Sequence, residues 1–160
     1  MAKKEMEREE MDADHAELRV YELGFHIDPE LGAEESKKVY QGIRSRMEAV
    51  GTIVAEGEPQ KIQLAYTISR SETGGRRDFD ASYFAWIAYE TDGKGHETIA
   101  EAARAESRIF RFLDLRTDKE AAKHSAEMHE LMLKNAEKNE VEEEEVSDTE
   151  LDNALKEVGV

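Results

Sequence analysis

The sequence contains no cysteine, only two prolines and one tryptophan, and no long apolar run. The absence of cysteine excludes a disulfide framework and a thiolate metal site. No apolar run approaches the roughly 20 residues that a membrane-spanning helix needs, and the first 16 residues are too polar for a signal peptide. We therefore expect a cytoplasmic protein, in a reducing compartment and without membrane contact.

Negative charge is what the sequence has in excess. It carries 38 acidic and 22 basic residues, a net charge of −16, and residues 119–160 alone hold 13 acidic and 5 basic residues. Such a chain is not expected to bind polyanions nonspecifically, but a local basic patch in its middle remains compatible with this balance. We expect a polar leader at 1–16, one domain at 17–118, and an acidic extension at 119–160 that is partly helical or disordered.

The apolar spacing of the middle part predicts four strands and two helices. The strands are expected at 18–27, 52–69, 79–90 and 108–116, and the helices at 34–50, ended by Gly51, and at 96–107. Pro59 indicates a bulge or a sheet edge within the second strand, and the paired glycines of 70–78 indicate a hairpin loop. The order predicts an α+β, ferredoxin-like β-α-β-β-α-β fold, a four-stranded antiparallel sheet with both helices on one face.

Two strands have informative faces. The stretch "KIQLAYTIS", residues 61–69, alternates, so Ile62, Leu64, Tyr66 and Ile68 are expected to pack beneath the helices. The strand at 79–90 is apolar on both sides, and its outward side presents Phe84, Trp86 and Ala88. Two outward aromatic residues indicate a covered surface. The cover could be a partner protein, a stacked base, a second copy or the chain's own tail.

The acidic extension is expected to be divided. Residues 119–138 have a weak amphipathic helical pattern, and the acidic run at 140–146 is expected to be disordered by self-repulsion. Residues 147–160 open with Ser147 and Glu150 at capping-box spacing, which indicates either a short docking helix or an unbound tail.

No motif indicates catalysis. His124 and His129 are five residues apart rather than the four of a zinc-binding helix, and the other histidines lie in different elements. The glycines of "TGGRRD" lack the Lys-Ser/Thr of a phosphate-binding loop. We expect no enzymatic activity, cofactor, metal or small-molecule substrate.

A set of basic residues lies in and beside the predicted sheet. Several are at strand ends or in the central hairpin, where they could meet one phosphate backbone, or they could balance carboxylates. The set comprises Arg19, Lys61, Arg70, Arg76, Arg77, Arg108, Arg111 and Arg116.

From Leu18 to Thr117 the sequence resembles bacterial small-subunit ribosomal protein six. Four ordered segments carry the resemblance: "RVYELGFHIDPEL", "KIQLAYTISR", "ASYFAWIAYE" and "AESRIFRFLDLR". The family's Gly-x-Arg-Arg before Leu-Ala-Tyr is replaced here by Pro59-Gln60-Lys61-Ile62-Gln63, and the hairpin insertion "SETGGRRDFDA" supplies Arg76 and Arg77 instead.

The resemblance implies a noncatalytic, ferredoxin-like protein of the small (30S) ribosomal subunit, located in the cytoplasm. It would bind the central domain of small-subunit ribosomal RNA together with small-subunit ribosomal protein eighteen, supporting translation. The expected RNA-binding residues are Arg19, Tyr21, Lys61, Arg70, Arg76, Arg77, Arg108 and Arg111. The expected partner-protein face consists of Phe84, Trp86 and Ala88.

Two alternatives remain. One is an RNA-recognition-like module that binds single strands, although "DASYFAWIA" lacks the glycine and leading base of that module's motif. The other is a ferredoxin-like dimer or ligand-binding domain without catalytic activity, which would use the apolar face of the sheet.

Overall fold

The computed structural model describes the backbone of residues 17–159, and the side chains of 17–138 together with those of residues 155 and 159. The predicted leader, residues 1–16, lies outside the described residues. The chain divides after Lys123 into a first and a second unit. Each unit is described by itself.

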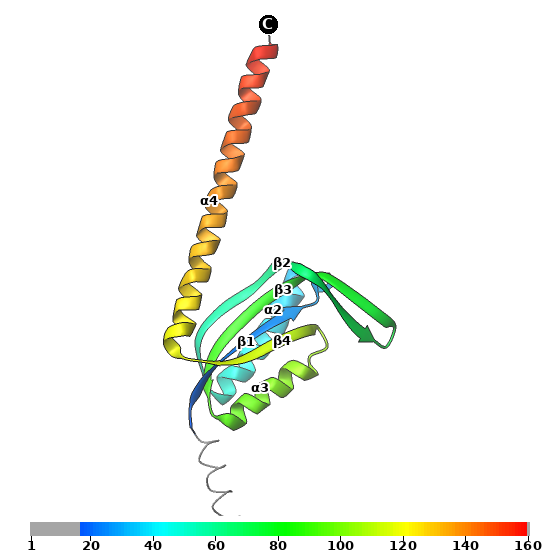
Figure 1. Ribbon diagram of the computed structural model, residues 1–160, viewed down its shortest axis with the longest axis vertical. Helices are drawn as coiled ribbons and strands as arrows, with labels where there is room; N and C mark the ends of the chain where they lie inside the picture. The colour runs from blue at the N-terminus through cyan, green and yellow to red at the C-terminus, as the bar shows by residue number, and fades with distance from the viewer. Residues whose placement is uncertain (1–16, 160) are drawn as a thin grey trace, which may run out of the picture. The chain divides into compact units, whose positions relative to one another are not determined.

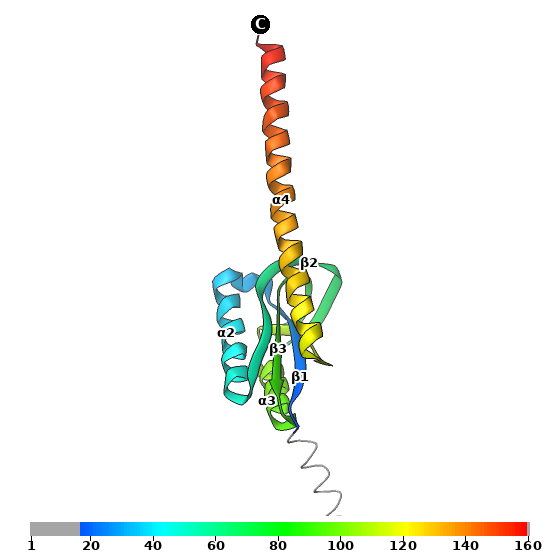
Figure 2. The same ribbon diagram turned by 90° about the vertical axis from the view of Figure 1, so that its left-hand side faces the viewer.

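The first unit contains a four-stranded sheet. Its elements are β1 (Arg19–Ile27), the 3-10 turn η1 (Pro29–Leu31), α2 (Gly32–Val50), β2 (Thr52–Glu72), β3 (Gly75–Thr91), α3 (Gly93–Ala105) and β4 (Ile109–Thr117). The strands lie in the order β2-β3-β1-β4, with antiparallel pairing throughout. Helices α2 and α3 both pack on one face of this sheet (Figure 1, Figure 2). The predicted ferredoxin-like α+β fold is confirmed.

The hydrophobic core lies between the sheet and the two helices. Alternate residues of β1 and β3 meet there in register, so that Leu23 faces Ile87 and Phe25 faces Ala85, all fully buried. Helix α2 contributes the stripe that the sequence predicts, and α3 contributes Ile99, Ala102 and Ala103. Burial of one stripe from each helix against one sheet face is what holds this layer together.

The ends of the two helices follow local capping chemistry. Helix α2 ends at Val50, as predicted, and the Gly51 N–H donates to the Met47 carbonyl at 2.9 Å. Helix α3 begins three residues earlier than predicted, because the Asp92 carboxylate accepts a hydrogen bond from the Gly95 N–H at 2.8 Å. An aspartate at this position satisfies a backbone donor that the first helical turn leaves free.

The β2–β3 hairpin is longer than predicted. Residues 70–72 and 75–78, expected in a loop, continue the ladder from Arg70↔Arg77 to Glu72↔Gly75, and only Thr73 and Gly74 form the turn. The register of β2 against β3 shifts at three places, including the segment from Gly57 to Gln60. The predicted bulge around Pro59 is therefore confirmed.

The expectation that "KIQLAYTIS" packs beneath the helices is wrong. Ile62 pairs with Ser82, which lies on the sheet face opposite α2 and α3, and Ile62 and Tyr66 are 37% and 63% exposed. The alternation holds, but two register shifts precede this stretch and a third interrupts it, and each shift changes which side of the strand faces the core. The apolar side of residues 62–68 consequently faces outward.

Helix α4 (Lys119–Val158) runs through the whole described extension. The helix expected at 119–138 lies within α4. The expected disorder at 140–146 and the two expected forms of residues 147–160 stay predictions. Residues 119–158 contain neither proline nor glycine and are rich in Ala, Glu, Lys and Leu, all good helix formers. In the first unit the start of α4 is held by an ion pair between Lys119 and Glu90 at 2.9 Å. Among the described residues, no helix is long and apolar enough to cross a membrane.

Candidate interface on the outer face of the sheet

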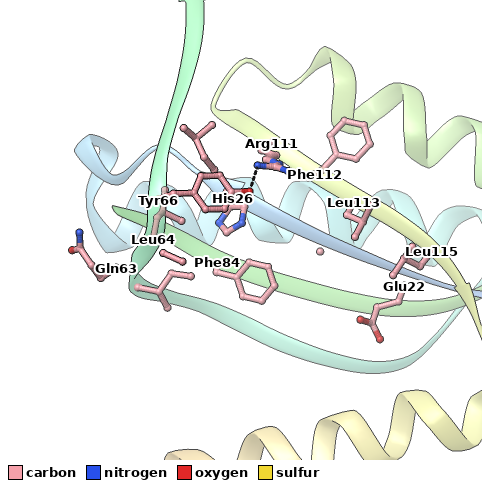
Figure 3. Close-up of a pocket in the computed structure, with 14 residues that line it drawn as sticks. Glu22, His26, Gln63, Leu64, Tyr66, Phe84, Arg111, Phe112, Leu113 and Leu115 are labelled. Carbon is pink, nitrogen blue, oxygen red and sulfur yellow. Dashed lines mark hydrogen bonds between the residues drawn. The ribbon is translucent and has the colours of Figure 1, made fainter. Parts of the chain in front are cut away.

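The sheet face opposite α2 and α3, here called the outer face, carries a groove with a volume of about 520 Å³ (Figure 3). Strands β1 and β3 form its floor, residues 62–68 of β2 form one wall, and β4 forms the other. This outer groove is lined by Glu22, Gly24, His26, Ile62, Gln63, Leu64, Ala65, Tyr66, Ile68, Phe84, Arg111, Phe112, Leu113 and Leu115. Most of its surface is aliphatic or aromatic.

A row of rings closes the hairpin end of the groove. The His26 ring lies 5.1 Å from that of Phe84 and 5.7 Å from that of Phe110, which stacks on the buried Phe79 ring at 4.0 Å. Ser82 and His26 share a hydrogen bond of 2.7 Å between Oγ and Nδ1. Burial, and secondarily the nearby Arg111, lower the pKa of His26. The imidazole is therefore a neutral packing element rather than a cation at neutral pH.

Arg111 lies at the same end and points its guanidinium at the groove. Its Nη1 donates a hydrogen bond of 2.9 Å to the Tyr66 hydroxyl (Figure 3), and the guanidinium lies 5.9 Å from the Tyr66 ring centroid. Among the side chains that the structure describes, no carboxylate forms an ion pair with Arg111. Its charge is therefore available to a ligand.

Glu22 lies toward the opposite end, beside Leu115. The carboxyl is partly buried, and this burial raises its pKa above the ordinary range. Within residues 17–138 it has no cationic partner. Between the two charged ends, Gly24 leaves the floor of the groove low, since a Cβ there would contact only the Phe84 ring, at 3.4 Å.

Most of the predicted RNA-binding arginines are already paired with carboxylates. Arg77 binds Asp28 through two hydrogen bonds, and Arg108 binds Glu106 in the same two-point manner. The other pairs are Arg19 with Glu17, Arg70 with Glu72, and Arg76 with Asp78. For these five residues the structure supports charge balance within the chain. An RNA phosphate would have to compete with each carboxylate.

Lys61 differs from these arginines. It lies on β2 opposite Tyr83, it is exposed, and no described carboxylate pairs with it. Lys61 and Arg111 are therefore the two predicted RNA-binding residues whose charge the described residues leave uncompensated.

Tyr21 is placed where RNA cannot reach it. It is 7% exposed, lies on the face covered by the helices, and stacks on the His96 ring at 3.9 Å with an interplanar angle of 10°. His96 Nε2 in turn lies 2.6 Å from Asp114 Oδ2, joining α3 to β4. The predicted RNA contact of Tyr21 conflicts with this burial, and the residue acts in the core instead.

The predicted partner-protein face is only partly accessible. Phe84 is half-buried and lines the outer groove, whereas Trp86 is 6% exposed and Ala88 is fully buried. Trp86 packs directly over Gly57 of β2, which faces it across the ladder. The expectation of an exposed aromatic pair is therefore wrong for Trp86. The role of Phe84 in partner binding stays a prediction.

The sequence reasoning missed most of the groove. Leu113 and Leu115 are 62% and 49% exposed. Together with Arg111 they occupy every second position of β4, on its outer side. That alternation is visible in "RFLDLR", but it does not say which side faces the helices. Gly24 gave a second signal, because glycine inside a strand often marks a close approach by another chain or ligand.

Comparison with known proteins bears on the fold. No family model matches the sequence, and no curated protein matches it either. Among solved structures, the 30S ribosomal protein S6 of Thermotoga maritima is similar at 20% identity and a TM-score of 0.51, covering 69% of this chain and 99% of that protein. An uncharacterized protein of T. maritima (10% identity, 64% of this chain, 100% of that one, TM-score 0.34) and CutA of Synechococcus elongatus (9%, 65%, 85%, 0.33) are also similar.

The likeness to 30S ribosomal protein S6 spans nearly the whole length of that protein and establishes the architecture. The first unit of this chain has the ferredoxin-like fold that this ribosomal protein has.

Proposed function

We propose that this protein is a structural component of the small ribosomal subunit in the cytoplasm. It binds the central domain of small-subunit ribosomal RNA together with small-subunit ribosomal protein eighteen, and it has no catalytic role. The observation that carries this proposal is the outer face, where an apolar groove includes the uncompensated Arg111, on a fold like that of 30S ribosomal protein S6. A second uncompensated cation, Lys61, lies on β2 opposite Tyr83, outside the groove lining.

The apolar part of the face supports the protein partner. Exposed apolar surface on a soluble chain typically marks a binding site, and here it is gathered in one groove rather than scattered. The fully buried part of a protein interface is depleted of charge and enriched in apolar and aromatic residues, as are the walls of this groove.

The cations support the RNA partner. Phosphate contacts position a protein on RNA without reading its sequence, and they need basic side chains that are free to pair. Lys61 meets that requirement, and Arg76, exposed in the hairpin, could exchange Asp78 for a phosphate. Because the set is small, binding to RNA should lose affinity with salt only with a shallow slope.

The direct test is sedimentation of small ribosomal subunits from the source cells. The protein should be recovered with that particle at about one copy per subunit, and it should remain bound in moderate salt. Recovery of the protein entirely in the soluble fraction, at normal expression, would contradict the proposal.

A further inference from the structure

The outer groove has opposite charges at its two ends. On β1, His26 pairs with Arg111 of β4, and Glu22 pairs with Leu115. The two positions on β1 are four residues apart, which corresponds to about 13 Å along a strand. Neither Arg111 nor Glu22 has an ion-pair partner among the described side chains, so each can attract a charge from outside.

The surface between the two charges is apolar. Leu113, Leu115 and Ile62 are 62%, 49% and 37% exposed and line opposite walls of the same groove. A chain with 38% charged residues has no shortage of polar side chains for such positions. Their exposure is best explained by a ligand that covers them.

The floor of the groove is lowered at its centre by Gly24. Glycine inside a strand weakens the strand, and packing within this chain does not demand it, since a Cβ would meet the Phe84 ring only at an ordinary contact distance of 3.4 Å. The missing side chain leaves room for another main chain to approach the sheet.

From these three observations we propose that the outer groove holds one segment of a partner protein, apolar in its middle, with a carboxylate that pairs with Arg111 and a Lys or Arg that pairs with Glu22. This inference rests on the proposed function, which supplies the partner. Complementary charges at both ends would fix the direction in which the segment lies and would exclude segments of the reverse polarity.

Two features of the groove disfavour RNA as its occupant. Proteins bind single-stranded nucleic acid by stacking bases on aromatic rings, whereas the walls here are mainly Leu and Ile. Glu22 also places a carboxylate where a phosphate backbone would pass. Lys61, which lies outside the groove lining, is the better candidate for a contact with an RNA phosphate.

The first test fills the groove. Gly24→Leu and, separately, Leu113→Lys are titrated calorimetrically with purified small-subunit ribosomal protein eighteen of the same organism. Each variant should bind at least about tenfold more weakly than the unmodified protein. Leu113 is exposed, so Leu113→Lys keeps the core intact if Gly24→Leu fails to fold. Gly42→Ala, in α2 with no atom near its added Cβ, is the matched control and should bind normally.

The second test addresses the charges. Arg111→Glu and Glu22→Lys should each weaken binding about tenfold at low salt, and the loss should shrink as salt screens the charges. Arg46→Glu on α2, away from the sheet's outer face, should leave the affinity unchanged.

Several results would overturn the inference. They are normal binding by both Gly24→Leu and Leu113→Lys, no binding by the unmodified protein, loss of ribosomal RNA binding instead of protein binding, or a dimer in solution that these variants dissociate. Sedimentation of the unmodified protein with the small subunit is measured separately. If it persists, the proposed function survives the failure of this inference.

Discussion

At the scale of single residues, the basic side chains divide by their partners rather than by their position in the sequence. Arg76 and Arg77 are adjacent, yet Arg76 makes an exposed pair with Asp78, whereas Arg77 binds the buried Asp28. The Arg77 guanidinium also lies 4.6 Å from the centroid of the Phe79 ring. Arg77 thus ties the hairpin to the end of β1, a structural role that its sequence context did not reveal.

Arg77→Gln is expected to destabilise the protein clearly at neutral pH, whereas Arg76→Gln should have little effect. Burial raises the pKa of Asp28, but hydrogen bonds from Arg77 and from the Glu30 N–H outweigh it, and the pKa lies below its ordinary value. A carboxylate with a lowered pKa stabilises the fold above its unfolded pKa and loses this contribution as the pH falls. The difference in unfolding free energy between the unmodified protein and Arg77→Gln should therefore shrink below about pH 4. Urea unfolding between pH 3 and pH 7, followed by circular dichroism, measures it, and a constant difference would contradict the explanation.

At the scale of elements, β2 decides which residues the outer face presents. Its register shifts let Gly57 lie under the Trp86 ring and turn residues 62–68 outward. The bend depends on Gly57, because a Cβ at this position would overlap the Trp86 ring and lie 2.8 Å from its Cδ1.

Gly57→Ala should accordingly destabilise the fold by about 1–3 kcal/mol, the usual cost of overpacking a closed site. Gly42→Ala makes the same chemical change inside α2, where a Cβ meets nothing within 4 Å, and should stabilise by roughly 0.5–1 kcal/mol. Chemical denaturation of both variants provides the comparison. Equal effects from the two substitutions would show that contact with Trp86 is unimportant.

Prediction from sequence succeeded for the elements whose signals are local. Apolar periodicity, together with the glycines and prolines that end helices and strands, was enough to predict the strand at 18–27 and the helix that ends before Gly51. The same signals gave the order of all six elements. The site was harder, because the outward side of residues 62–68 depends on where β2 pairs with β3, and the burial of Trp86 depends on a glycine 29 positions earlier in the chain. Pairings between positions so far apart in the chain cannot be predicted from the sequence pattern of a short segment.

At the scale of the whole molecule, charge and core are segregated. Every residue of the hydrophobic core cluster lies between Tyr21 and Ile109, whereas residues 124–160 hold 12 acidic and 3 basic residues. Among the described side chains, none from the second unit belongs to that core cluster, while the sequence of this unit adds net negative charge.

On the proposed function, a chain that ends at Lys123 should keep the thermal stability of the sheet and bind a central-domain ribosomal RNA fragment a few-fold more tightly at low salt, because fewer negative charges repel the RNA. The gain should vanish toward 1 M salt, where the screening length is only about 3 Å. Filter binding across a salt series measures this, and a full-length variant with Gln at positions 142–145 should show part of the same gain. Weaker binding by the shortened chain would indicate that the extension makes contacts of its own.

The burial of Trp86 also has an optical consequence. It is the only tryptophan, and all tyrosines and phenylalanines lie between residues 21 and 112. Intrinsic fluorescence and absorbance at 280 nm therefore report on the first unit alone, while the 40 residues of α4 contribute to far-ultraviolet ellipticity without any emission of their own. Far-ultraviolet ellipticity also reports α2, α3 and the sheet, so a loss of ellipticity without a change in fluorescence would identify melting of α4 alone.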